Sequence, residues 1–284
     1  MTGAPTAAGI WAHHAHVFPE AVRPQGSVDA LLRLLDACGI EGAVCFAPFA
    51  RQLAGSGIEG NGWLATAVRP HAGRLLGFGT VDFDAGDPGG QVARVRELGF
   101  GGIKLHPAVQ GFHVLSAPLL AVYERAEELG LFLSFHTGVH HARLADARLA
   151  DFDEIAFRFP RLRFSLEHVG GWAFFREAVG VIQNNLGRAH ATGRGTVYAG
   201  LTAVFSAREP AWYLPPRGPD SIEGLVAQVG ADHVIFGLDF PYKSAAYVQE
   251  AIGLILGLTI ADDEKAGVLG GTLRAVLTVP PRRD

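Results

Sequence analysis

Short apolar runs alternate with helix-length segments from one end of the chain to the other. The apolar runs end at Gly, Pro or polar residues, which is typical of buried strands. Strands that alternate with helices predict β-α units around a parallel sheet. We therefore expect eight strands, at residues 9–16, 42–50, 75–83, 101–107, 131–138, 162–171, 195–205 and 233–242.

The segments between these runs carry helix start and stop signals. Ser27 and Gly39 bound one such segment as N-cap and stop, and Ser116 and Gly130 bound another. We expect further helices at 151–160, 171–187, 219–230 and 244–257, and one closing helix at 262–277.

Eight strand-helix units in 284 residues predict a (β/α)8 TIM barrel of the α/β class. A doubly wound sheet usually has fewer strands and often a glycine-rich first turn, but no G-x-G-x-x-G follows the first expected strand. No long linker and no internal repeat divides the chain. We expect one domain over residues 1–284.

Composition excludes several classes of function. The chain has 24 Lys and Arg against 28 Asp and Glu, with no basic block, so nucleic acid is not an expected partner. No signal peptide and no run of about eighteen apolar residues is found, so we expect no membrane partner. The two cysteines, Cys38 and Cys45, lie in apolar runs and are expected to be reduced. A cytoplasmic protein is expected.

Three histidines, His13, His14 and His16, lie within four positions of the first expected strand. Chance alone yields about half an H-x-H pair in a chain of this composition, so the motif is weak by itself. Side chains alternate between the two faces of a strand. Alternation places His14 and His16 inside the barrel and His13 outside, where we expect it to pack against the helices.

Other ligand-type residues end other expected strands. Lys104 and His106 end the fourth strand, His136 the fifth, His168 the sixth and Asp239 the eighth. The carboxyl ends of barrel strands meet at one rim, where active sites lie. Unpaired polar groups there would be costly, so packing alone does not account for this set.

Imidazoles with one carboxylate suit a divalent metal, zinc above manganese or iron. An ion with an open coordination position lowers the pKa of its bound water toward neutrality. Asp239 would take the proton from that water and pass it to the leaving group. His168 would bind the ion or polarise a substrate oxygen.

Five stretches resemble the amidohydrolase superfamily, in its branch of metal-dependent TIM barrels that includes decarboxylases, lactonases and hydratases. They occur in family order and cover most of the chain. The stretches are "HAH" (14–16), "GFGGIKLHPAVQGF" (99–112), "GLFLSFHTG" (130–138), "FPRLRFSLEHVGG" (159–171) and "VIFGLDFPY" (234–242).

The resemblance implies roles for the strand-end residues. It implies that His14 and His16 bind the metal, that His136 completes the imidazole ligation, and that Asp239 is both ligand and acid or base. His168 is implied to lie beside the metal or the substrate. The branch commonly works with one ion, so one is expected rather than two.

Three positions leave questions open. The family often has Asp two residues before the first metal-binding histidine, and Ala12 stands there, so a carboxylate that orients the ligands is missing. In binuclear relatives a lysine that ends the fourth strand, as Lys104 does here, is carbamylated and bridges two metals, but a contact with a nearby carboxylate or with substrate is the commoner use of such a lysine. His106 is expected either to contact substrate or to form a structural hydrogen bond.

Residues in the loops after the strands are expected to line the substrate pocket. Trp172 and Tyr242 are favoured because they follow the sixth and eighth strands, and Arg51 and Arg143 are candidates for binding an anionic substrate group. The other candidates are Phe112, His140, His141, Phe205 and Phe240.

The leading hypothesis is metal-dependent hydrolysis of an ester, lactone or amide bond in a small molecule. The alternative is non-oxidative decarboxylation of an aromatic or unsaturated acid, in which Asp239 delivers a proton to carbon. A third reading is a catalytically idle binding barrel, against which the complete ligand set argues. A homodimer is one option for the quaternary state, because similar barrels often pair through their outer helices.

Overall fold

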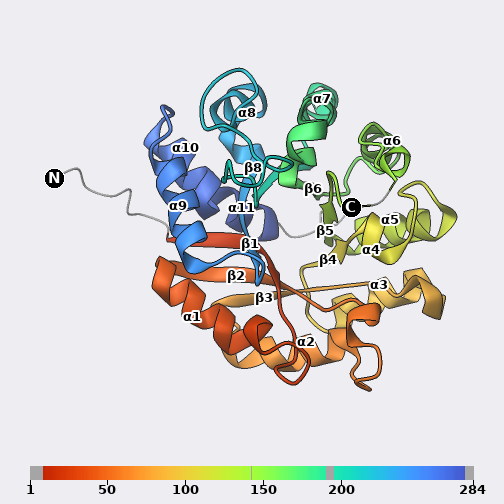
Figure 1. Ribbon diagram of the computed structural model, residues 1–284. Coiled ribbons are helices and arrows are strands. Elements are labelled where there is room, and N and C mark those ends of the chain that lie inside the picture. The colour runs from red at the N-terminus through yellow and green to blue at the C-terminus, as the bar shows by residue number, and fades with distance from the viewer. Residues whose placement is uncertain (1–8, 142, 190–194, 279–284) are drawn as a thin grey trace.

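Eight parallel strands close into a barrel with the hydrogen-bonded order β1 to β8, and β8 pairs with β1 (Figure 1). The computed structural model describes residues 9–141, 143–189 and 195–278. The (β/α)8 architecture predicted from the alternating pattern is confirmed. The strands are β1 (Ile10–His16), β2 (Ile40–Phe46), β3 (Leu75–Gly79), β4 (Gly102–Leu105), β5 (Phe132–His136), β6 (Phe164–Glu167), β7 (Val197–Thr202) and β8 (Val234–Phe240).

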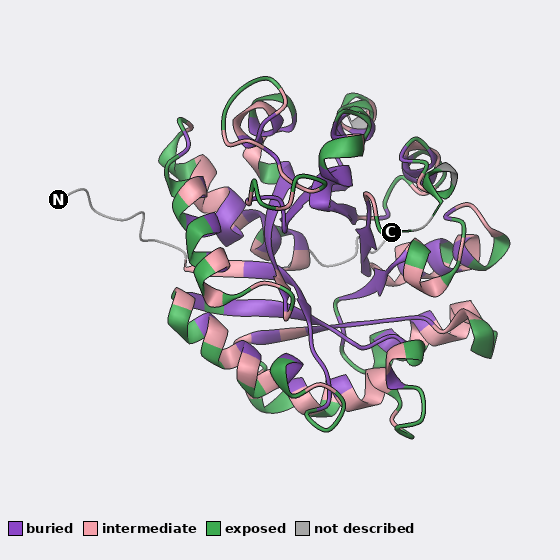
Figure 2. Cartoon of the chain, in the orientation of Figure 1, coloured by how far each residue is buried: buried purple, intermediate pink, exposed green. Residues whose placement is uncertain are grey.

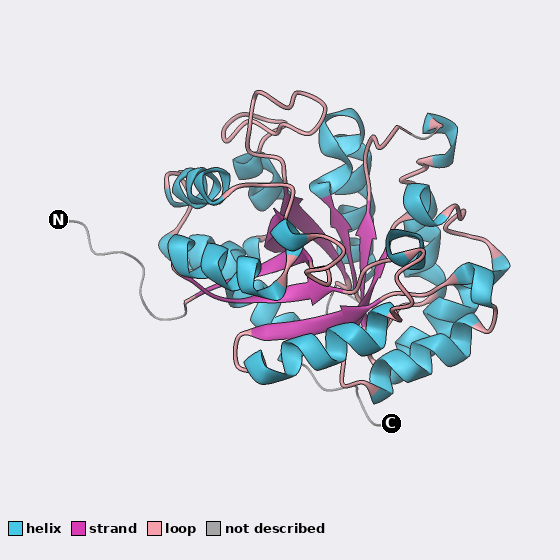
Figure 3. Ribbon diagram, turned by 60° about the horizontal axis from the view of Figure 1, so that its bottom comes forward, coloured by secondary structure: helices cyan, strands magenta, loops and turns pink. Residues whose placement is uncertain are grey.

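Helices surround the strands on the outside of the barrel (Figure 3). No helix in the described part of the chain is both long and apolar enough to cross a membrane. The helices are α1 (Val28–Cys38), α2 (Gly60–Val68), α3 (Pro88–Glu97), α4 (Pro107–Gln110), α5 (Ala117–Leu129), α6 (Asp151–Arg158), α7 (Gly171–Ala189), α8 (Ile222–Val229), α9 (Ala245–Leu256), α10 (Asp262–Ala266) and α11 (Thr272–Thr278).

Helix boundaries follow the capping signals in part. The Ser27 hydroxyl accepts a hydrogen bond from the backbone N–H of Ala30 at 3.2 Å, and Gly39 ends α1 with φ of +66°, as predicted. Ser116 occupies the N-cap position of α5, but its side chain makes no capping bond. The helices α2 and α3 were not predicted, because short glycine-rich sequences begin both of them.

Two apolar layers hold the barrel together. The larger layer lies between strands and helices and includes Leu31 and Leu35 of α1. The smaller one is a cluster of buried side chains from strands and from α11, and these strands are buried along most of their length (Figure 2). This second cluster, here called the inner cluster, consists of Val44, Phe46, Phe78, Phe132, Tyr198, Ile235, Leu273 and Val276. Because these side chains fill one part of the barrel, polar groups gather at the carboxyl ends of the strands.

The expected closing helix at 262–277 is divided into two helices. A π-type turn at Gly267–Gly271 separates α10 from α11, with Gly270 at φ of +156°. A Cβ atom on Gly270 would lie 2.5 Å from the backbone nitrogen of Trp11, so the turn lets the chain approach β1 closely. The helical periodicity of the sequence continues through this turn, which is why one helix was expected.

This close approach predicts opposite effects for two Gly→Ala substitutions. Gly270→Ala should lower the free energy of unfolding by about 1–3 kcal/mol, because the new methyl group meets backbone atoms of β1. Gly253→Ala is the matched control, since Gly253 is an exposed position of α9 with open space around its Cβ. It should raise stability by roughly 0.5–1 kcal/mol. Urea unfolding followed by circular dichroism measures both, and equal effects would contradict the described packing.

Candidate active site

The carboxyl ends of β1, β4, β5, β6 and β8 bring the predicted site residues to one end of the barrel. All but Asp239 are almost completely buried, and Asp239 exposes 15% of its side chain. The strand-end residues that meet there are His14, His16, Lys104, His106, His136, His168 and Asp239.

A bulge in β1 determines which histidines face the interior. His14 has φ of +66°, and the pairing of β1 with β2 shifts register between Ala12 and Ala15. A bulge adds one residue to a strand and interrupts its alternation of faces. His13 and His14 consequently both contact the same carboxylate, that of Glu167, although they are neighbours in sequence.

The prediction that His13 lies outside the barrel is therefore wrong. Its side chain is fully buried, and its ring centroid lies 5.2 Å from that of Phe46 and 5.4 Å from that of Phe78. Both phenylalanines belong to the inner cluster. Strict alternation failed because the sequence gives no sign of the bulge at His14.

His14, His16 and Asp239 form a group whose donor atoms suit one divalent cation. His14 Nε2 lies 3.1 Å from His16 Nε2 and 3.6 Å from Asp239 Oδ1. One ligand atom from each residue lies within 4.8 Å of the others. Burial first, and then the charge of Lys104, hold the pKa of both histidines well below the usual range, so both are neutral. Neutral imidazoles and a carboxylate are what a divalent metal requires, so these residues fit such an ion.

Glu167, at the end of β6, orients this group and was not among the residues predicted from the sequence. Its carboxylate lies 2.6 Å from His14 Nδ1 and accepts a hydrogen bond from Thr202 Oγ1 at 2.9 Å. It also accepts one from the Ser165 hydroxyl. Burial alone would raise the pKa of Glu167, but its interactions with the rings of His13 and His14, hydrogen bonds included, hold that pKa well below the usual range.

The contact with Glu167 fixes the tautomer of His14. The Nδ1–H of His14 donates to the carboxylate, so Nε2 keeps its lone pair for the ion. Glu167 thus supplies an orienting carboxylate that Ala12, as an alanine, does not provide. Ala12 itself is buried in the layer between strands and helices. Gly200 leaves room for it, since a Cβ there would lie 2.7 Å from the Glu167 carboxylate. An acidic residue inside the apolar run "FSLEH" was the available signal.

Lys104 faces the group formed by His14, His16 and Asp239, the candidate metal-binding group, rather than the solvent. Its Nζ lies 3.5 Å from His14 Nε2 and 4.9 Å from the ring centroid of Phe46, and the side chain is fully buried. Burial lowers its pKa to about 8, against the opposing charges of Glu167 and Asp239. The charge of Lys104 therefore acts directly on the ring nitrogen of His14 that would bind an ion.

His168 and His136 form a hydrogen-bonded chain beside this group. His168 Nδ1 lies 2.7 Å from the carbonyl oxygen of Thr202, so this nitrogen carries the proton. His168 Nε2 therefore accepts from His136 Nδ1 at 3.2 Å, which leaves a lone pair on His136 Nε2. The His168 ring centroid is 5.2 Å from that of His14. The ligation of the ion by His136 stays a prediction.

His106, His136 and His140 form a second group of donor atoms within 4.8 Å of one another. The rings of His106 and His136 stack with centroids 3.8 Å apart and planes only 8° from parallel. An imidazole binds a metal near its own ring plane, and two stacked planes share no such point. His106 Nδ1 also accepts a bond from the backbone N–H of Val109 at 3.4 Å. His106 thus forms the structural hydrogen bond that was one of its two expected roles.

The aromatic residues near the site differ from the expected ones. Trp172 is 70% exposed and does not line the pocket described beside the site, so its contact with substrate stays a prediction. Trp212, in the loop after β7, lies at the site, with its ring centroid 4.8 Å from His168 and 5.8 Å from His136. The Tyr242 ring lies 5.7 Å from the ring of His16, and its contact with substrate stays a prediction.

The remaining candidates fall into two sets. Phe205 and Phe240 are buried in the layer between strands and helices and do not line a described pocket. Arg51 is mostly exposed and lies 3.9 Å from Asp84. A pocket beside the site is lined in part by Phe112, His140 and Arg143. His141 is exposed, and its ring packs against that of His140.

Residues 11–278 match the sequence profile of the amidohydrolase family. The chain belongs to the amidohydrolase family. The predicted resemblance is confirmed over almost the whole length, and the protein is an amidohydrolase-related enzyme. No curated protein matches the sequence at a significant level.

Several solved structures share the fold of this amidohydrolase. The 5-carboxyvanillate decarboxylase of Sphingomonas paucimobilis has 17% identity and a TM-score of 0.70, covering 96% of this chain and 100% of that chain. The 5-carboxyvanillate decarboxylase of Novosphingobium aromaticivorans, solved with bound manganese, has 16% identity and a TM-score of 0.69. The match covers 98% of this chain and 99% of that chain. The 2,6-dihydroxybenzoate decarboxylase of Rhizobium has 15% identity and a TM-score of 0.65. The match covers 95% of this chain and 99% of that chain.

The position of Glu167 predicts a loss of metal affinity when its charge is removed. Glu167→Gln should weaken binding of Mn²⁺ or Zn²⁺ by ten- to a hundredfold, because the amide no longer holds the tautomer of His14. Ser165→Ala is the matched control, since Ser165 bonds to Glu167 and not to His14. We expect the control to change affinity less than threefold. Competition with a chelator measures both, and unchanged affinity in folded Glu167→Gln protein would refute the role.

Proposed function

We propose that this amidohydrolase-family enzyme is a metal-dependent decarboxylase of a small aromatic or unsaturated carboxylic acid. The sequence analysis ranked hydrolysis first and decarboxylation second. The similar structures favour the second reading, because three of them are decarboxylases of aromatic acids. Manganese, already a candidate ion beside zinc and iron, gains support because one of these decarboxylases was solved with manganese.

The observation that carries this proposal is the setting of Arg23, in the loop after β1. Its guanidinium donates to the Tyr242 hydroxyl at 3.1 Å, and it lies over the rings of Tyr242 at 4.7 Å and Phe18 at 5.1 Å. The Tyr242 ring is in turn 5.7 Å from that of His16. In the described part of the chain no carboxylate pairs with Arg23. A guanidinium held by aromatic rings and left without an acid suits a carboxylate ligand.

His14, His16 and Asp239 would hold one divalent ion, with His136 as a further candidate ligand. When bound, that ion supplies a Lewis acid that polarises substrate oxygens. Arg23 binds the carboxylate, and Lys104 adds positive charge close to His14. His168 contacts the substrate, and its orientation is fixed by the bond to the Thr202 carbonyl.

Asp239 is the proton donor of the proposed reaction. Burial raises the pKa of its carboxyl group to about 6, against the lowering charges of Lys243 and Lys104. The bond between the substrate carbon and its carboxylate breaks, and the electron pair stays on that carbon. The proton of Asp239 adds to the same carbon as carbon dioxide leaves, and solvent then returns a proton to Asp239.

The reaction is tested by incubating the manganese-loaded protein in D₂O with hydroxybenzoates and other aromatic acids. We expect carbon dioxide together with a product that carries deuterium at the former carboxylate position. Asp239→Asn should lower the rate by about 10²- to 10⁴-fold, because it removes the proton donor. Hydrolysis of lactones or amides without carbon dioxide would contradict the proposal, and metal-loaded protein inert to all these compounds would favour the idle barrel.

Arg23 predicts a separate effect on substrate binding. Arg23→Gln should raise KM for the acid at least tenfold while kcat changes less than threefold, because the contact is made in the bound state before reaction. Arg51→Gln is the matched control, since Arg51 is mostly exposed and makes its described ion pair with Asp84. Steady-state kinetics on both variants decides this. A similar KM for Arg23→Gln and the parent would remove Arg23 from the substrate site.

A further inference from the structure

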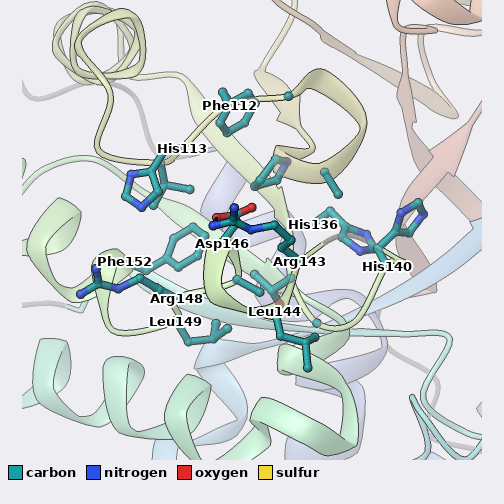
Figure 4. A pocket seen from close by; sticks show the side chains of 17 residues that line it. Phe112, His113, His136, His140, Arg143, Leu144, Asp146, Arg148, Leu149 and Phe152 are labelled. Carbon is teal, nitrogen blue, oxygen red and sulfur yellow. Dashed lines mark hydrogen bonds and ion pairs between the residues drawn. The ribbon is translucent and has the colours of Figure 1, made fainter.

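A pocket of about 330 Å³ opens beside the candidate active site, between the chain segments that follow β4 and β5 (Figure 4). Its walls include the apolar side chains of Phe112, Leu149 and Phe152. Its inner end includes His136 and Thr137, at the carboxyl end of β5. The volume is at the lower end of the roughly 300–1,000 Å³ typical of small-molecule sites.

The pocket reaches one of the strand-end histidines, His136. His136 Nε2 is buried and has no hydrogen-bond partner among the described residues, although its ring lines the pocket. The ring centroids of His136 and His168 are 4.7 Å apart, and those of His168 and His14 are 5.2 Å apart. Two ring-to-ring contacts, from His136 to His168 and from His168 to His14, therefore connect the wall of the pocket to the metal-binding group.

The charges at the rim of the pocket are paired. Arg143 lies 3.3 Å from Asp146, and Arg148 lies 3.6 Å from Asp151. His113 also contacts Asp151, at 3.2 Å. Each described arginine of the lining thus has its own carboxylate partner, in contrast to Arg23. The pocket favours an uncharged apolar group over a second acid.

We infer that this pocket binds the apolar end of the substrate and makes the enzyme selective for amphipathic monocarboxylic acids. The carboxylate lies toward Arg23 and the metal-binding group, and an apolar ring or branched chain lies between Phe112 and Phe152. The orientation of the reacting end rests on the proposed function. The apolar selectivity rests on the pocket alone, so the two are separable by experiment.

Binding of three unreactive acids to the manganese-loaded full chain tests this inference by calorimetry. The probes are acetate, 3-phenylpropionate and 3-(4-carboxyphenyl)propionate. We expect phenylpropionate to bind at least tenfold more tightly than acetate, because its ring leaves water for the pocket. The diacid should lose most of this gain, because its second carboxylate meets no free cation there. Equal affinity for acetate and phenylpropionate would overturn the inference.

Two variants that fill the pocket test its location. Ala147→Phe and Ala108→Phe add a ring at lining positions, and Ala108 is exposed at the rim, so the second variant keeps the fold if the first does not. Each should reduce the preference for phenylpropionate to less than threefold without changing acetate binding. Ala150→Phe is the matched control, an exposed position of the same segment outside the lining. Retained preference in both filling variants, or equal loss in the control, would overturn the location.

These outcomes are distinct from those of the proposed function. Apolar preference without release of carbon dioxide from any acid would leave the pocket standing and remove the decarboxylase proposal. Release of carbon dioxide without apolar preference would support the decarboxylase proposal and overturn the role of the apolar pocket.

Discussion

The Glu167 carboxylate is the interaction on which the arrangement of the site depends. It is fully buried, and an ionised carboxylate without partners would be very costly there. His14, His13, Thr202 and Ser165 all contact it, from three different strands. The contacts satisfy the buried charge and at the same time fix which nitrogen of His14 is free. The cost of burying Glu167 is thus coupled to the orientation of the His14 ring.

The bulge at His14 makes this interaction sterically feasible. A strand of regular alternation would direct only one of His13 and His14 toward Glu167. With the bulge, His13 fills space against the phenylalanines of the inner cluster while His14 reaches the polar layer. Gly200 of β7 provides the space that the carboxylate itself occupies. The bulge at His14 and the absence of a side chain at Gly200 are therefore both part of the site.

The sequence predicts the barrel and the strand-end residues well, because both follow from periodicity. The alternation of apolar runs with helices is repeated eight times, so errors in single boundaries do not change the architecture. His14, His16 and Asp239 come together because parallel strands end at one rim. His13 was misplaced because a bulge leaves no mark in the apolar pattern. Arg23 and Trp212 were missed because they belong to loops, whose paths depend on contacts far away in sequence.

The two ends of the candidate site differ in charge. Arg23, Lys104 and the metal-binding group make one end suitable for a carboxylate, whereas the pocket beside His136 is apolar with paired charges at its rim. An acid bound in this way would present its carboxylate to the ion and keep its apolar part away from water.

The central claim is that His14, His16 and Asp239 hold one divalent ion, with His14 oriented by Glu167. Anomalous diffraction from crystals soaked in manganese or zinc tests it most directly. The account predicts one strong peak at about 2.0–2.3 Å from His14 Nε2, His16 Nε2 and a carboxylate oxygen of Asp239. A peak between His106, His136 and His140, or no peak at saturating metal, would contradict it.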